Sequence, residues 1–294
     1  MNSSQYSTNR FAITCVLFSS MMWGIIWYPL RLLDMAGMPG VWSSLIMYLA
    51  AAVMTLPFLL KRGIFPSAIR NDLLLLAFSA GITNVAFVIA LIEGEVMRVM
   101  LLFYLSPLWA VLLGRWCLGE KLSTQAMIML CVAMSGSVVM LWNPEMGWPW
   151  PHGLADWLAL MAGFSFSVNN LQARKLASVD MRTKTGVIWW GVTIISAIVI
   201  LAQQSSIPDV SIQVWAGAWL LGCLGIVVMT VAVLYGVARM PLYQSSVIML
   251  FELIVAAIAA WWLTDEVMTL YEWLGGGLIL VAAYGVARSE RNKG

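Results

Sequence analysis

Ten apolar runs follow one another along almost the whole chain, with short polar connections between them. They fall at 11–33, 40–60, 72–92, 96–118, 123–142, 153–176, 184–204, 212–237, 241–263 and 270–288. An α-helix needs about 20 apolar residues to cross a hydrocarbon core about 30 Å thick. Of the 294 residues, 62% are hydrophobic and only 10% are charged, whereas about a quarter are charged in soluble domains. The sequence therefore predicts an all-α integral membrane protein with ten transmembrane helices.

The chain also repeats itself. Segment 94–121 corresponds to segment 240–267, and the hydropathy on both sides stays in register. Identical pairs in this register include Glu120 and Glu266, Trp116 and Trp262, and Ala110 and Ala256, and upstream Ala86 and Ala232. We therefore predict two five-helix repeats, at 1–145 and 146–294. Because five is odd, the repeats lie in the membrane with opposite orientations, an arrangement typical of transporters that work by alternating access.

The positive charges predict how the chain is oriented. With ten helices and the N-terminus in the cytoplasm, fourteen of the sixteen Lys and Arg residues fall on the cytoplasmic side, and Arg31 and Arg98 fall on the other side. This asymmetry follows the positive-inside rule. We expect a multi-pass protein of the cell inner membrane with both termini in the cytoplasm, surrounded by the lipid bilayer.

Several short motifs occur in a recognisable order. They are Trp23-Gly24, Pro107 within the fourth run, Gly119-Glu120-Lys121 at its end, and Asp265-Glu266 at the end of the ninth. This set resembles the ten-helix EamA-type branch of the drug/metabolite transporter superfamily. The resemblance implies an exporter or exchanger of small metabolites such as amino acids, with a cavity between helices 1–4 and 6–9. Glu252 and Arg98 are not general features of that family, so its substrates do not transfer through them.

Glu252 is the main functional candidate. It lies about eleven residues into the ninth run, near the middle of the bilayer, and Ser106 is its counterpart in the first repeat. A carboxyl group at this depth costs at least a few kcal/mol and tends to face a cavity or a partner. We expect it to contact a substrate ammonium or to couple transport to protons. The alternative is a structural carboxyl that joins two helices.

Arg98 opens the fourth run on the outer side. It could bind a substrate carboxylate, or it could pair with Glu93 or Glu95 as a gate or an interfacial salt bridge. Helical rise puts Arg98 about 12 Å from the depth of Ser106 and Glu252. Arg98 and Glu252 together would then recognise a zwitterion, the first on its carboxylate and the second on its ammonium.

Other polar and aromatic residues lie at useful depths. Pro107 is expected to kink its helix, because proline removes a backbone donor and leaves a carbonyl free. Of the adjacent Asn169 and Asn170, at most one is expected to face a narrow cavity squarely. The remaining candidates for substrate contact are Asn84, Ser106, Gln244, Trp23, Tyr104 and Tyr235.

Several kinds of site are not expected. A metal site is not expected, because the chain has a single histidine and no two of its four cysteines have metal-ligand spacing. No ATP-binding motif or cofactor motif is present, and no basic tract indicates nucleic acid. Gly275-Gly276-Gly277 could pack within the chain or form a dimer face, so monomer and homodimer both stay open.

These features predict a secondary transporter, not an enzyme. We expect export of an amino acid or a related amphipathic solute, with proton coupling as a possibility. The alternatives are an exporter of organic cations that uses Glu252 alone, an intramembrane enzyme and a channel.

Overall fold

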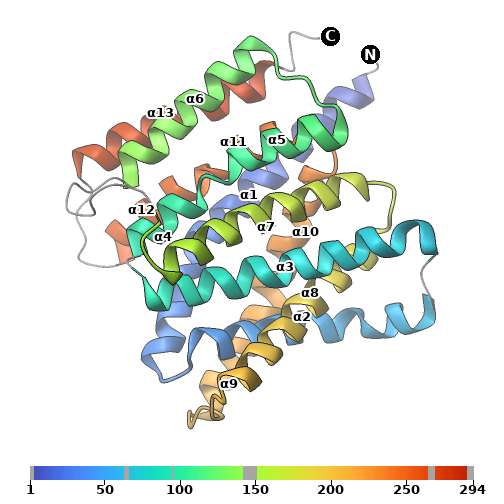
Figure 1. Cartoon of the computed structure of the whole chain (residues 1–294), viewed down its shortest axis with the longest axis vertical. Helices are drawn as coiled ribbons and strands as arrows, with labels where there is room; N and C mark the ends of the chain where they lie inside the picture. Colours follow the sequence, from blue (N-terminus) through green and yellow to red (C-terminus); the bar gives the residue numbers. More distant parts are fainter. Residues whose placement is uncertain (1–2, 63–65, 95, 142–150, 264–268, 290–294) are drawn as a thin grey trace.

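The computed structural model describes residues 3–62, 66–94, 96–141, 151–263 and 269–289, and within these ranges the regular structure is helical. The helices are α1 (Ser3–Met35), α2 (Gly40–Arg62), α3 (Ser67–Glu93), α4 (Val96–Phe103), α5 (Ser106–Leu118), α6 (Thr124–Leu141), α7 (Leu154–Lys175), α8 (Met181–Ala202), α9 (Ile212–Leu220), the π-helical turn η2 (Leu221–Ile226), α10 (Val227–Val237), α11 (Leu242–Met249), α12 (Phe251–Leu263) and α13 (Leu270–Ser289). They lie side by side as one bundle (Figure 1).

Three of the predicted helices are interrupted. The fourth consists of α4 and α5, the eighth of α9, η2 and α10, and the ninth of α11 and α12. Joined in this way, the described segments give the ten helices that the sequence predicts. Eight of these are long and apolar enough to span a membrane, and Leu270–Val286 is a shorter apolar helix. The helix α7 is less apolar because polar side chains occupy much of its length.

The two repeats break at equivalent places. The helix α4 ends at Phe103 and α11 ends at Met249, in the register that the sequence comparison uses. The next helix begins at Ser106 in the first repeat and at Phe251 in the second, beside Glu252. The protein therefore has the two-repeat architecture, with each half interrupted in its fourth helix near mid-membrane.

The bundle is held together by close backbone contacts. The helix α3 packs along α7 and α8, α2 packs along α8, and α1 packs along α10 and α12, while α6 and α13 pack on each other at the edge of the bundle (Figure 1). A Cβ atom on Gly191 would overlap the backbone of Ala77, and one on Gly222 would overlap the backbone of Met47. Small residues permit this approach between membrane helices.

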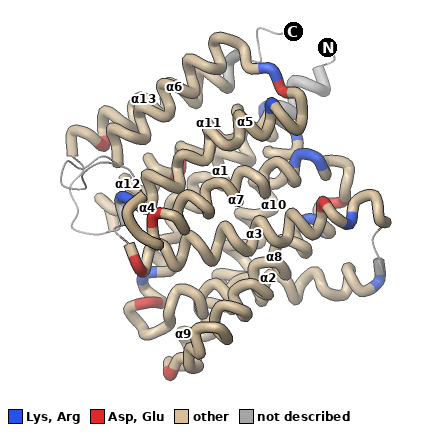
Figure 2. Tube along the Cα trace, viewed as in Figure 1, with Lys and Arg blue, Asp and Glu red and all other residues tan. Residues whose placement is uncertain are grey.

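Charge is sorted along the bundle. Both termini lie at one end, and Figure 2 shows most of the Lys and Arg residues that it colours at that same end. A few basic residues lie at the opposite end, where α4 begins. Arg98 is the third residue of α4. We call the first end the terminal end of the bundle.

Gly191→Val tests the close packing of α8 on α3. The added side chain meets backbone that has no rotamer to change, so we expect a loss of about 1–3 kcal/mol in the free energy of unfolding. Thermal unfolding in detergent micelles measures it as a lower melting temperature. Gly277→Val is the matched control, since a Cβ there meets nothing within 4 Å. Equal melting temperatures for the two variants would contradict this account.

Candidate functional site

A cavity of about 170 Å³ lies at mid-depth in the bundle. Its lining residues come from α1, α2, α3, α4, α5, α7, α8, α10, α11 and α12, or from the short breaks between them, and so from both repeats. Of the described residues, those of α6 and α13 are not among the lining. The cavity thus occupies the position that the resemblance implies, between the first four helices of each repeat.

Glu252 reaches this cavity from the first turn of α12. The partial positive charge at a helix N-terminus favours a carboxylate there. The Tyr104 side chain, which comes from the break between α4 and α5, lies beside the Glu252 carboxyl in the same cavity wall. A Cβ atom on Gly24 would lie 2.7 Å from the backbone oxygen of Glu252, so only glycine lets α1 support this turn so closely. Residues of the first repeat therefore border Glu252 of the second.

The break between α4 and α5 is stabilised by α7. Pro107 has no N–H, which leaves the carbonyl of Phe103 without its helical partner. Gly163 lies against that carbonyl, since a Cβ on Gly163 would be 2.6 Å from the oxygen. The Ser167 hydroxyl donates to the Ser106 carbonyl at 2.8 Å. The predicted interruption at Pro107 is therefore present, and it places Ser106 in the cavity wall.

An aromatic group forms the next part of the wall. The Phe103 ring lies 4.7 Å from Phe87, 5.6 Å from Phe166 and 5.3 Å from Tyr104, measured between ring centroids. Trp23 also lines the cavity, as the sequence predicts. Sequence reasoning missed the three phenylalanines, because one phenylalanine in an apolar helix cannot be told from a lipid-facing one.

Amide side chains complete the polar part of the lining. Asn84, Asn169 and Asn170 all line the cavity; the sequence predicts that at most one of the last two faces it squarely. The Asn169 amide donates to the Leu76 carbonyl at 3.1 Å, and the buried Asn170 amide lies 3.9 Å from the Met249 sulfur. Both asparagines can line the cavity because α3 packs on one side of α7 and α11 packs on the other.

Arg98 lies elsewhere, at the start of α4. Its Nε donates to the Asp156 carboxylate at 2.8 Å, and the two side chains are 11% and 8% exposed. Asp156 also accepts a hydrogen bond from the His152 backbone N–H at 2.8 Å. From the sequence, Arg98 could bind a substrate carboxylate or pair with Glu93 or Glu95; in the structure it forms an ion pair with Asp156 of the second repeat. Asp156 lies 58 residues after Arg98 in the sequence, so no local pattern indicates that the two side chains pair.

Gln244, Tyr235 and Glu93 are not in the cavity wall. Gln244 is fully buried and its amide has no hydrogen-bond partner among the described residues; it lies about 200° around α11 from the lining residue Ser246. Tyr235 stacks under Arg239, whose guanidinium is 3.6 Å from the ring centroid. Glu93 is exposed at the end of α3. Glu95 lies outside the described residues.

The Arg98–Asp156 pair is expected to be structural. Arg98→Gln leaves a nearly buried carboxylate without its main counter-charge, which costs about 3–5 kcal/mol. We expect Arg98→Gln and Asp156→Asn each to lower the melting temperature in detergent, and the double variant to lose less than the sum of the two. Arg31→Gln, at an exposed position, serves as the control. Additive losses would mean that the two side chains are not coupled.

Comparisons with known proteins agree with this architecture. The model of the EamA-like transporter family matches residues 10–142 and 153–288. A solved structure titled "Crystal structure of protein" is similar to this chain over 98% of both chains, with a TM-score of 0.76 and 16% sequence identity, which shows a shared fold. A search of curated protein sequences found no match. The two family matches cover both halves of the chain, which therefore belongs to the EamA-like transporter family and is a membrane transporter of the drug/metabolite transporter type.

Proposed function

We propose that this protein is a secondary transporter that moves a small amphipathic amine by alternating access. The observation that carries the proposal is the composition of the cavity wall. Glu252 is the sole Asp, Glu, Lys, Arg or His among the described lining residues. An ammonium group would bind the Glu252 carboxylate, while the apolar part of the solute packs on the aromatic rings of Phe103 and its neighbours.

The Glu252 carboxyl would also couple transport of the amine to a proton gradient. A carboxyl at mid-depth can exchange a bound proton for a bound ammonium, so that a proton gradient drives the amine in the opposite direction. The basic terminal end supports an orientation in the cell inner membrane with both termini in the cytoplasm, and export is the direction that we propose. The halves 1–145 and 146–294 would exchange roles during this cycle.

An amino acid is the second candidate. Its ammonium would occupy the same place at Glu252, and its carboxylate would face Asn84 or Ser106, which can both donate hydrogen bonds. Arg98 does not serve this carboxylate in the observed arrangement, because its guanidinium is paired with Asp156. The cavity therefore favours the organic amine, the alternative in which Arg98 makes no substrate contact.

A matched pair of ligands separates the two candidates. Phenethylamine and phenylalanine differ only in the carboxylate, and isothermal titration calorimetry in detergent compares their affinities. We expect tighter binding of phenethylamine, and a loss of about tenfold or more in Glu252→Gln, since a hydrogen bond to a charged group contributes about 1.5–3 kcal/mol. Glu272→Gln, at the exposed start of α13, is the matched control and should bind normally.

Counterflow in proteoliposomes then tests transport itself. Labelled phenethyltrimethylammonium is suitable because its fixed charge prevents leakage through the bilayer. Saturable uptake into vesicles loaded with the unlabelled compound, lost in Glu252→Gln, is the expected result. If phenylalanine bound as tightly as phenethylamine, and Arg98→Gln weakened its binding, the proposed substrate would be an amino acid instead of an amine. Failure of every amine and amino acid to bind or exchange would contradict the proposal.

A further inference from the structure

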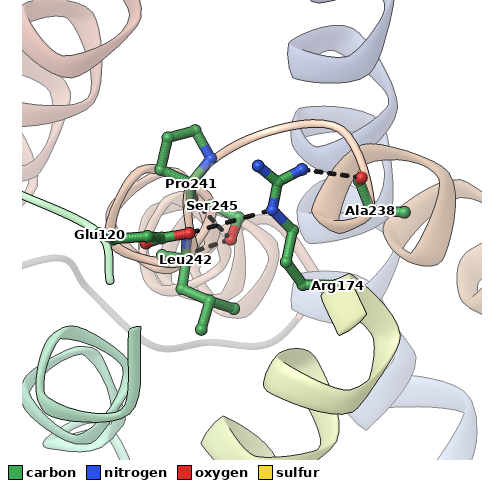
Figure 3. A network of polar contacts seen from close by, with 6 residues as sticks. All are labelled: Glu120, Arg174, Ala238, Pro241, Leu242 and Ser245. Carbon is green, nitrogen blue, oxygen red and sulfur yellow. Dashed lines mark hydrogen bonds and ion pairs between the residues drawn. The ribbon is translucent and has the colours of Figure 1, made fainter. Parts of the chain in front are cut away.

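Four helices meet around Glu120 at the terminal end of the bundle. Its carboxylate accepts hydrogen bonds from the backbone N–H of Leu242, at 3.0 and 3.3 Å to the two oxygens. The Arg174 guanidinium lies 3.9 Å from the same carboxylate and donates to the Ala238 carbonyl at 2.9 Å. Figure 3 shows Glu120 and Arg174 converging on the first turn of α11. We call Glu120, Arg174, Ala238 and Leu242 the latch.

The local sequence explains how Glu120 reaches this place. The helix α5 ends at Gly119, whose φ of 66° is left-handed and favours glycine. The chain then turns back, and the Glu120 N–H bonds to the Gly114 carbonyl at 3.0 Å. Gly114 leaves room for the carboxylate, because a Cβ there would lie 2.8 Å from its Oε2. Leu242 is the first residue of α11, where the backbone N–H groups lack partners within the helix.

The latch lies directly beside the cavity. Three of its members are four residues from a lining residue on the same helix, about 6 Å along the axis and on the same face. These pairs are Arg174 with Asn170 on α7, Ala238 with Leu234 at the end of α10, and Leu242 with Ser246 on α11. The latch therefore closes the bundle one helical turn from the cavity, on the side of the terminal end.

Given the transport function proposed above, we propose that the latch is a gate between the cavity and the terminal end, and that it opens and re-forms in every transport cycle. It joins α5 of the first repeat to α7, α10 and α11 of the second. Burial raises the pKa of the Glu120 carboxyl, an effect that the Leu242 N–H and then Arg174 partly offset. A carboxylate that is costly to bury and held by few contacts regains hydration when the gate opens.

The neighbouring contacts indicate which part moves. The α4–α5 pair is joined to α7 at two further points, Arg98–Asp156 and Ser106–Ser167. Between α5 and α11, the Glu120 carboxylate accepts the hydrogen bonds of the Leu242 N–H at the end that faces the termini. Opening would therefore separate α11 from α5, and Glu120 would leave the N-terminus of α11.

An engineered disulfide can hold this gate closed. An ideal Cβ on Gly114 lies 3.6 Å from the Leu242 Cβ, which is within the range of about 3.5–4.5 Å found in disulfides. The Gly114→Cys/Leu242→Cys variant should be made with Cys15, Cys117, Cys131 and Cys223 replaced by alanine. The atom that the new side chain would meet at Gly114 is the end of the Glu120 side chain, which can move aside.

The expected result is reversible loss of exchange with retained binding. Oxidation should reduce the counterflow rate of phenethyltrimethylammonium at least about tenfold, and dithiothreitol should restore this rate. Calorimetry in detergent should still detect phenethylamine binding to the oxidised protein. The two single-cysteine variants are the controls, and oxidation should leave their counterflow unchanged. Undiminished counterflow with the disulfide formed would overturn the gate. Absence of both binding and exchange in the reduced protein and in the wild type would instead overturn the proposed function.

A second measurement opens the gate instead of locking it. Glu120→Ala removes both the cap on α11 and the partner of Arg174, whereas Glu120→Gln keeps one acceptor oxygen for Leu242. With a reporter Ser246→Cys in the cysteine-free background, a water-soluble maleimide should label Glu120→Ala about tenfold faster than the parent, and Glu120→Gln at an intermediate rate. Equal labelling rates in all three proteins would contradict a gate held by Glu120.

Discussion

The membrane interior contains no water to satisfy a backbone N–H or C=O group, so each must find a partner within the protein. This chain nevertheless interrupts a helix near mid-membrane in each repeat, after Phe103 and after Met249. At the first break, Ser167 of α7 donates a hydrogen bond to the Ser106 carbonyl, and Gly163 lets α7 pack against the Phe103 carbonyl. The second lies beside Gly24, which brings α1 against the Glu252 carbonyl. The cavity forms where these two breaks face the centre of the bundle.

This constraint explains what the sequence could predict. Helix positions follow from apolar length, and the observed ends at Val96, Leu118, Ile212 and Leu263 agree with the predicted boundaries. Pro107 predicts the interruption of the helix after Phe103. The break at Met249 has no proline and was not predicted; it lies at the position equivalent to Phe103 in the other repeat.

Side-chain direction was harder to predict than depth. Glu252, Asn84, Trp23 and Tyr104 lie at the cavity as expected, because polar or amphipathic groups at mid-depth have few other environments. Gln244 is equally polar, but it lies about 200° around α11 from the lining residue Ser246 and is not part of the cavity wall. Partners distant in sequence, such as Asp156 for Arg98 and Leu242 for Glu120, could not be deduced, because neither spacing nor composition records which helices adjoin.

The second broken helix links the cavity to the latch. Its first half, α11, is two turns long, with Leu242 at one end and the break before Glu252 at the other. A short rigid helix transmits a displacement from end to end, since its own hydrogen bonds resist deformation. An ammonium that draws Glu252 into the cavity would therefore act on the N-terminus of α11, where Glu120 holds Leu242. In the first repeat, α4 is equally short and begins beside the Arg98–Asp156 pair. The inverted repeat thus gives each half a short helix that runs from the cavity to a polar contact, at opposite ends of the bundle. In the transport cycle proposed above, a solute that binds one arrangement more tightly than the other would shift the population between them.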